Sequence, residues 1–170
     1  MVTYMLPITQ LEYLDDDGRS PFGLWLEHLD DVALMKVTIA LQRLSNGNTS
    51  NAKSIGSTTS DGPPDMPLTK DFKETVLKDM RERKGFREAM LQEGISCLLA
   101  GELDLGKEVL RDYINATMGF EKLSRKVDLP VKSLMRMLGP NGNPQAKNLF
   151  AVIAALQKDA GIELQVMAAE

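Results

Sequence analysis

The sequence predicts a mainly α-helical protein whose last hundred residues form a helix-turn-helix bundle, preceded by a small segment with one strand and two helices. Three observations support this prediction. Apolar residues recur at helical spacing from residue 68 onward, a Ser/Thr/Gly/Pro-rich stretch at 57–65 divides the chain, and residues 119–147 have the pattern of two short helices joined by a sharp turn. The 170 residues suffice for one ordinary domain or two small ones.

Composition narrows the classes of function. The single cysteine, Cys97, allows no intramolecular disulfide, and together with the single histidine, His28, it makes no recognisable zinc site. We therefore expect no cofactor. No apolar run approaches the ~18 residues that span a membrane, and no secretory signal is visible at the N-terminus. We expect a cytoplasmic protein with no membrane partner.

The first segment opens with an edge strand over residues 3–14, where apolar side chains alternate and Pro7 removes a backbone donor. Ser20 is a good N-cap and Pro21 a good first residue for a helix over Phe22–Leu29. Asp30 or Asp31 caps a second helix that runs to about Leu44. The inner faces of these helices are expected to comprise Phe22, Trp25, Leu26 and Leu29, then Val32, Met35, Ile39 and Leu44.

Three longer helices follow in the second segment. The first begins near Lys70, capped by Thr69, and ends near Arg83; the others span Phe86–Ala100, with Gly101 just past the end, and Leu103–Ala116. Their inner faces are expected to comprise Phe72, Val76, Leu77 and Met80; Phe86, Met90, Leu91, Ile95, Leu98 and Leu99; and Leu105, Val109, Leu110, Tyr113 and Ile114. Cys97 is expected to be a buried free thiol.

The helix-turn-helix lies within Gly119–Lys147. Asp128 occupies the turn, where it tolerates a left-handed backbone, and Pro130 starts the second short helix. A further helix is expected from Pro144 to about Lys158. The apolar residues that hold these helices are expected to be Leu123, Leu129, Leu134 and Leu138, with Leu149, Val152, Ile153 and Leu156 from the last helix.

The charge pattern makes this region a candidate DNA-binding surface. Six Lys/Arg and two acids give residues 119–147 a net charge of +4, whereas the whole chain has −4. A basic island on a helix-turn-helix is typical of DNA-binding proteins. We expect Val131, Lys132, Ser133 and Arg136 to face outward and read bases, and Lys126, Gln145, Lys147 and Asn148 to contact phosphates. The alternative is an all-α domain that does not bind DNA.

The C-terminal stretch Gly161–Met167 has the alternation of a strand, with Ile162, Leu164 and Val166 on one face. A lone strand is unstable in water. We expect it to pair with the same strand of a second copy, which would give a homodimer whose two recognition helices match DNA half-sites about 34 Å apart or a multiple of that. The alternatives are a strand that folds back on the first segment and a frayed tail.

Part of the first segment resembles a known toxin family. Asp17–Phe22 (DGRSPF), Trp25-Leu26, Ile39–Leu44 and Gly47-Asn48 resemble the opening half of RelE-like addiction-module toxins of the phage-derived subgroup. Asn51–Gly56 is similar to the start of that family's next strand, but the later strands with the RNA-cleaving residues are absent. The resemblance implies that residues 1–56 are a truncated toxin fragment without catalysis, so that the chain is not an enzyme, followed by a linker at 57–67. An unrelated helical hairpin is the alternative.

The rest of the chain resembles the helix-turn-helix antitoxins and transcriptional regulators of addiction modules. The resemblance implies a lambda-repressor-like domain over residues 68–170 that binds operator DNA as a dimer, represses its own operon and binds a RelE-like toxin. The alternative is a toxin-neutralising module with little DNA affinity. The matching stretches are Leu68–Thr75, Phe86–Ala89, Glu93–Leu99, Leu110–Thr117, Lys132–Met137 and Gly142–Phe150.

Overall fold

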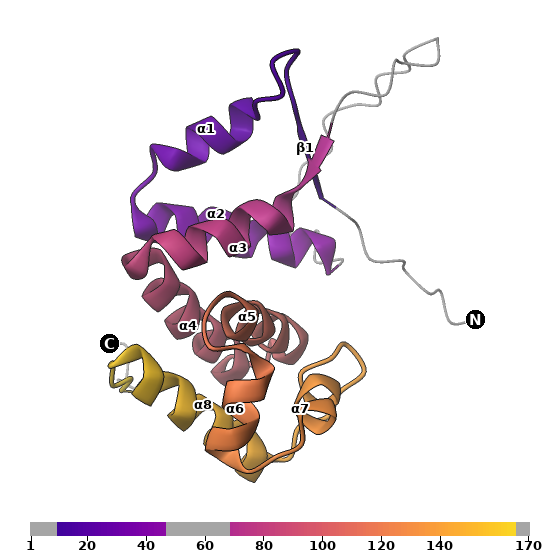
Figure 1. The fold of residues 1–170 in the computed structure, drawn as a ribbon, viewed down its shortest axis with the longest axis vertical. Helices are drawn as coiled ribbons and strands as arrows, with labels where there is room; N and C mark the ends of the chain where they lie inside the picture. Colours follow the sequence, from indigo (N-terminus) through magenta and orange to yellow (C-terminus); the bar gives the residue numbers. More distant parts are fainter. Residues whose placement is uncertain (1–9, 47–68, 166–170) are drawn as a thin grey trace, which may run out of the picture. The chain divides into compact units, whose positions relative to one another are not determined.

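The fold is mainly helical, as the sequence predicts, and it contains one small two-stranded sheet (Figure 1). The computed structural model describes residues 10–46 and 69–165. The chain divides into two compact units, residues 1–76 and residues 77–170. The predicted strand residues 3–9, the stretch from Gly47 to Gly56 and the linker at 57–67 lie outside the described residues.

The first unit begins as the capping pattern predicts. The Ser20 hydroxyl oxygen accepts a hydrogen bond from the Gly23 amide at 2.8 Å, and Asp30 Oδ1 accepts one from the Ala33 amide at 2.8 Å. These two caps start both predicted helices, because each satisfies an amide that has no partner inside its helix. The elements are β1 (Leu11–Tyr13), α1 (Pro21–Glu27), α2 (Asp31–Ser45), β2 (Thr69–Asp71) and the start of α3 (Phe72–Glu82).

The start of α3 differs from the prediction. Thr69 does not cap a helix at Lys70; it lies in β2, which pairs antiparallel with β1 in the register Leu11 to Asp71. Asp71 takes the capping position, since its Oδ1 accepts a hydrogen bond from the Lys73 amide at 2.9 Å. The partner of the first strand is therefore the beginning of the second predicted segment.

The inner face of α2 is also different from the prediction. Val32 is 52% exposed, whereas Leu34, Thr38 and Gln42, spaced four residues apart, are buried. These three residues share one face of a helix with Ile39, which was correctly predicted. The polar side chains of Thr38 and Gln42 hide this stripe from a search for apolar periodicity.

A buried polar cluster ties β1 to the end of the first unit. Glu12 is 3% exposed, and its Oε1 accepts a hydrogen bond from the Thr75 hydroxyl. Lys70 Nζ lies 3.0 Å from the same hydroxyl oxygen. The Phe22 and Phe72 rings lie beside this sheet with their centroids 5.8 Å apart. Residues from both predicted segments therefore form one folded unit.

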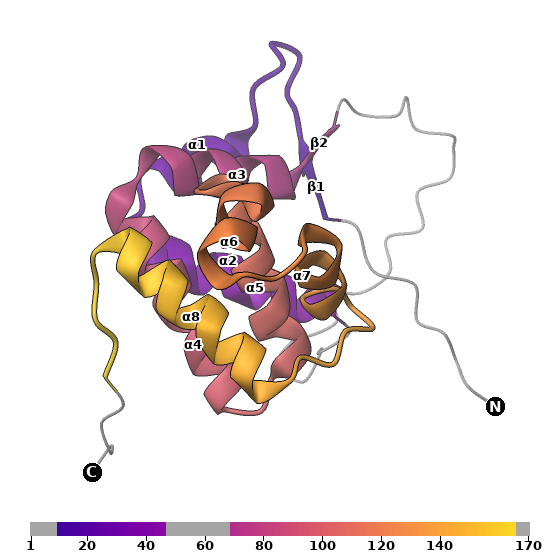
Figure 2. The same cartoon turned by 60° about the horizontal axis from the view of Figure 1, so that its bottom comes forward.

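The second unit contains the five remaining helices of the described chain, and Figure 2 shows α8 running beside α6. Its core combines α4, α5 and the helix-turn-helix with α8. Leu99, predicted to face inward, is instead 62% exposed, because it lies in the last turn of α4. Gly101 follows that helix with a φ of +84°, as predicted. The helices are α4 (Lys84–Leu99), α5 (Leu103–Ala116), α6 (Gly119–Val127), α7 (Val131–Met137) and α8 (Ala146–Ala160).

The residues after α8 form no strand within the described range, which ends at Gln165. The Ile162 amide donates to the carbonyl oxygen of Gln157 at 3.2 Å, and the Leu164 amide donates to its side-chain oxygen at 2.8 Å. Ile162 packs in part against the core. Pairing with a second copy stays a prediction, and Val166 lies outside the described residues.

α4 and α5 approach each other closely at two glycines. A Cβ atom on Gly106 would lie 2.6 Å from Leu98 Cγ and 2.9 Å from the carbonyl oxygen of Gly94. A Cβ atom on Gly94 would lie 2.8 Å from Val109 Cγ1. Both positions therefore have room only for the hydrogen atom that glycine carries in place of a side chain.

We expect Gly106→Ala to lower the free energy of unfolding by about 1–3 kcal/mol, the usual cost of overpacking a core. Helix propensity alone would give the opposite sign, a gain of about 1 kcal/mol. Denaturant unfolding of the full chain separates the two effects. Ser96→Ala, at an exposed position on α4, is the control and should leave stability nearly unchanged. A more stable Gly106→Ala variant would contradict the close approach.

Candidate nucleic-acid interface

α6 and α7 are the two short helices that the sequence predicts on either side of the turn at Asp128. Asp128 ends α6 in the left-handed conformation, with φ 53° and ψ 45°, as its place in the turn predicts. The Ser124 hydroxyl donates to the carbonyl oxygen of Leu129 at 2.6 Å, so this side chain fastens the turn as well as being small. Pro130 then leads into α7, where its missing N–H costs nothing.

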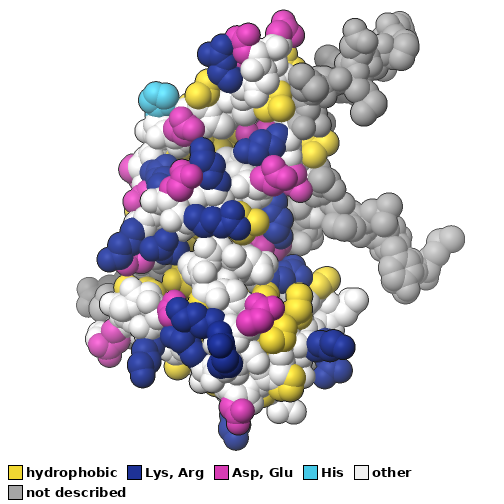
Figure 3. Space-filling model, viewed as in Figure 1, with side chains coloured by type: hydrophobic (Ala, Val, Ile, Leu, Met, Phe, Trp, Pro, Cys, Tyr) yellow, Lys and Arg dark blue, Asp and Glu magenta, His cyan; other side chains and the backbone are white. Residues whose placement is uncertain are grey.

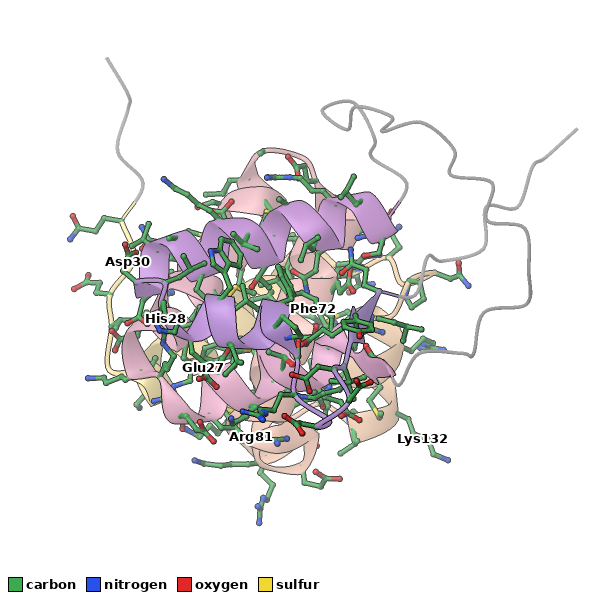
Figure 4. The ribbon with its side chains drawn as sticks, turned by 90° about the horizontal axis from the view of Figure 1, so that it is seen from above. Glu27, His28, Asp30, Phe72, Arg81 and Lys132 are labelled. Carbon is green, nitrogen blue, oxygen red and sulfur yellow. The ribbon has the colours of Figure 1, made fainter. Side chains whose placement is uncertain are left out.

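Three fully buried leucines fix the orientation of α7. Leu123, Leu134 and Leu138 have no exposed surface, as predicted, and Leu129 packs partly against them. The opposite face of α7 is therefore free to contact a partner, and Figure 4 shows Lys132 extending from it. The exposed residues of α7 are Lys132, Met135, which is 53% exposed, and Arg136.

The positions of two α7 residues were not anticipated. Met135 was not predicted to face outward, because a methionine at helical spacing usually belongs to a core. Val131 was expected to be offered to the outside, but it is half-buried and packs against the core. The first turn of α7 needs an apolar residue there to close the helix against its neighbours.

A hollow of about 440 Å³ lies between α7 and the start of α8. It brings together four of the eight residues predicted to contact DNA: Ser133, Arg136, Gln145 and Asn148. Asn141 and Asn143, which line the same hollow, were not among the predicted site residues. Their signal in the sequence was the polar loop itself, whose amides can donate to and accept from base edges and phosphates.

A buried lysine from α5 holds this loop in place. Lys107 is only 4% exposed, and its ammonium group donates to the carbonyl oxygens of Gly142 at 2.8 Å and Pro140 at 3.4 Å. Asp104 Oδ1, one turn earlier, lies 2.9 Å from the same nitrogen. This role could not be predicted from the sequence, because Lys107 lies 35 residues before the Gly142 carbonyl that it holds.

Gly142 completes the loop because no side chain fits there. A Cβ atom would lie 2.3 Å from the carbonyl oxygens of both Arg136 and Met137, which is far inside van der Waals contact. The Gly142 amide also donates to the carbonyl oxygen of Gly139 at 2.9 Å. The loop is thus packed tightly on the end of α7, which fixes the distance between Arg136 and the start of α8.

Two lysines of α6 share one carboxylate. Asp159 Oδ1, near the end of α8, lies 2.7 Å from Lys126 Nζ and 3.1 Å from Lys122 Nζ. The hydrogen bond from Lys126 is the largest influence on Asp159 and, with Lys122, holds the pKa of its carboxyl below the usual value against a smaller opposing effect of burial. Lys126 is therefore bound to Asp159 at the C-terminal end of α8. At a rise of 1.5 Å per residue, Asp159 lies about 20 Å along the helix from Gln145.

The surface over α6 is basic, as Figure 3 shows by the Lys and Arg side chains that gather there. The predicted DNA-contacting residues nevertheless fall into separate groups. Lys132 and Lys147 are exposed, on α7 and in the first turn of α8, but neither lines the hollow. The compact group around Arg136 is the part of the predicted site that the fold assembles.

We call the contact of Lys107 with the carbonyl oxygens of Pro140 and Gly142 the Lys107 clamp. It can be tested by Lys107→Met, which keeps the length of the side chain but removes the hydrogen-bond donor. We expect the free energy of unfolding to fall by about 1–3 kcal/mol, since two partly buried carbonyl oxygens lose their charged donor. Amide hydrogen exchange in residues 139–143 should accelerate. Lys158→Met, at an exposed position on α8, is the control. Unchanged exchange in the loop would show that Lys107 does not hold it.

The Asp159 ion pairs predict a pH dependence. The pKa of Asp159 is lowered in the folded chain, so its contribution to stability is present above the unfolded value of about 3.9 and is lost as the pH falls through the folded value. We expect Asp159→Asn to be less stable than the unmodified chain at neutral pH, with the difference vanishing in acid. Unfolding midpoints measured between about pH 7 and pH 2 test this. Glu163→Gln, at an exposed position, should show no such convergence.

The comparisons with known proteins add no family. No protein-family model, no curated protein and no solved structure matches the chain. Within residues 10–46 and 69–165, no helix is long and apolar enough to cross a membrane, and no group of three His, Cys, Asp or Glu side chains could hold a metal ion. Among the described residues, the helix-turn-helix with its hollow is the feature on which a function can be argued.

Proposed function

We propose that this chain is a sequence-specific DNA-binding transcriptional regulator of antitoxin type that represses its own operon. The observation that carries the proposal is the pair α6 and α7, with Asp128 in the left-handed turn and α7 held by buried leucines so that its polar face stays exposed. A helix presented in this way fits the major groove of DNA, where each base pair has a distinct pattern of donors and acceptors.

In this proposal the exposed face of α7 reads the bases. Lys132, Met135 and Arg136 lie at spacings of three and four residues, so they share one side of the helix. Arg136 can donate two hydrogen bonds to a guanine edge, and Met135 can contact a thymine methyl group. Ser133 and the loop asparagines line the hollow beside Arg136 and contribute further polar contacts.

The start of α8 is the proposed phosphate-binding end. Gln145 occupies the N-cap position without a side-chain hydrogen bond to the helix, so the first amides of α8 are not capped by it. Lys147 is exposed in this first turn. Free amides and a lysine at a helix N-terminus favour a phosphate group. Because Lys126 is paired with Asp159, we expect it to contribute less than Lys147.

We further propose that the regulator is a homodimer formed through its C-terminal stretch. An apolar hollow of about 630 Å³ is lined by Leu164 together with Leu99, Leu103 and Phe150, each of which is at least half exposed except Leu164. The backbone of residues 162–165 forms no strand pairing within the described chain. The same stretch from a second copy would cover these side chains and pair with the backbone groups that Gln157 does not already hold.

Toxin binding is the second candidate function, favoured by the sheet in the first unit. β1, from the segment that resembles a toxin, pairs with β2, from the start of the segment that resembles an antitoxin. Glu12 and Thr75 form a hydrogen bond across the same two segments. A strand of this kind can bind a complete toxin by the same backbone hydrogen bonds.

The test is a fluorescence-anisotropy titration of the full chain against the DNA upstream of its own gene and against a scrambled duplex, at two salt concentrations. We expect preference for the upstream DNA, two chains bound per duplex, and affinity that falls steeply with salt, because phosphate contacts release counterions. Equal and weak binding to both duplexes would reject the DNA-binding role and favour toxin binding, which a pull-down with RelE-like toxins would then examine.

Matched variants separate base contacts from phosphate contacts. Arg136→Gln should cost about 1–3 kcal/mol on the upstream DNA and little on the scrambled duplex. Lys147→Gln should weaken both complexes evenly, and Lys126→Gln should have the smaller effect of the two lysine variants. An even loss on both duplexes for Arg136→Gln would show that Arg136 contacts only phosphate.

A further inference from the structure

A third hollow, of about 490 Å³, lies near the C-terminal end of α8. Its lining comes from the C-terminal ends of α3, α5 and α8, the first turn of α4, and α6. The volume falls within the range of about 300–1,000 Å³ that is typical of sites for small molecules. None of the residues that line it belongs to the proposed DNA-reading face of α7.

Tyr113 contributes a hydrogen-bond donor that has no partner. Its side chain is 2% exposed and lines the hollow, and its hydroxyl group makes no hydrogen bond within the described part of the chain. Buried tyrosine hydroxyls normally have a partner. Burial is the main cause of the raised pKa of this hydroxyl; Arg87 opposes the shift, and the carboxylates of Asp159 and Glu88 add to it. The group therefore keeps its proton and can donate a hydrogen bond to a ligand.

Four cationic side chains line the same hollow as Tyr113, together with the carboxylates of Glu88 and Asp159. Arg87 Nη1 donates to the carbonyl oxygen of Met80 at 3.1 Å, which orients the guanidinium group at the end of α3. Lys84 is highly exposed and pairs loosely with Glu88 at 3.5 Å. The other two cations that line the hollow are Arg81 and Lys122.

Two of these cations are available to a ligand. Arg81 is exposed, and its side chain makes no ion pair or hydrogen bond within the described part of the chain. Lys122 is paired with Asp159, but Lys126 holds the same carboxylate oxygen more closely, at 2.7 Å against 3.1 Å. Lys122 can therefore turn toward an anion without leaving Asp159 unpaired.

We propose that this hollow binds a small phosphate-bearing molecule, with its phosphoryl oxygens among Arg81, Arg87 and Lys122 and one oxygen accepting from the Tyr113 hydroxyl. Guanidinium groups match phosphate geometry with two parallel donors, and several cations suit a group with two negative charges. The volume exceeds the needs of a bare phosphate ion, so the ligand is a phosphate ester with an organic part.

The test is isothermal titration calorimetry of the full chain with phenyl phosphate and with inorganic phosphate, against sodium chloride at matched ionic strength. We expect saturable binding of one phenyl phosphate per chain, tighter than inorganic phosphate. Tyr113→Phe and Arg81→Gln should each weaken it about tenfold or more, the usual effect of losing a hydrogen bond to a charged group. Arg136→Gln, in the hollow beside α7, is the matched control and should bind phenyl phosphate normally.

Several outcomes would overturn the proposal. The first is a heat of phenyl phosphate binding no larger than the heat measured with sodium chloride. The second is equal affinity for phenyl phosphate and inorganic phosphate. The third is phenyl phosphate binding that is unchanged in both Tyr113→Phe and Arg81→Gln. Loss of binding in Arg136→Gln alone would place the phosphate in the α7–α8 hollow instead. Circular dichroism checks that each variant is folded, and Arg81→Gln carries the test if Tyr113→Phe is not, because Arg81 is exposed. The experiment contains no DNA, so its result is independent of the proposed regulatory function.

Discussion

The close approach of α4 and α5 is the constraint on which the second unit depends. Gly94 and Gly106 leave no room for a side chain between the helices, so α5 lies deep in the bundle and most of its residues are buried. Because α5 is fixed there, Lys107 reaches the loop after α7 and Tyr113, less than two turns further on, lines the hollow near the C-terminal end of α8. One buried helix thus positions both candidate sites.

The hollow beside α7 and the hollow that contains Tyr113 differ in chemistry because different parts of the chain close them. The one beside α7 is bounded by a polar loop and lined by amides, a serine and Arg136. The one at the end of α8 combines cations with the Tyr113 hydroxyl and the carboxylates of Glu88 and Asp159. Asp159 links this hollow to α6 through Lys122 and Lys126. When Asp159 is counted with the residues it contacts, the net charge of the basic region at residues 119–147 falls from +4 to +3. A count along the sequence cannot show this.

Local signals in the sequence predicted most helices well. Ser20, Asp30 and Gly101 mark helix ends through hydrogen bonds and backbone angles that involve only near neighbours. Asp128 in the turn and the buried leucines of the helix-turn-helix were predicted for the same reason.

Long-range features were missed where no local pattern encodes them. β2 was predicted as the start of a helix, because its pairing with β1 joins residues about sixty positions apart. The role of Lys107 depends on carbonyl oxygens, which every residue has, so the loop sequence could not reveal it. The hollow that contains Tyr113 gathers residues from 81 to 160, and the unpaired hydroxyl of this tyrosine is visible only once the helices are packed.

The Lys107 clamp also bears on how this protein can evolve. Lys107 holds the loop by main-chain oxygens, and Gly142 is required there by its lack of a side chain. Asn141 and Asn143 are exposed and line the hollow, yet neither takes part in the clamp. Their side chains can therefore change by mutation while the scaffold persists, which would let such a loop acquire preferences for new ligands without a loss of stability.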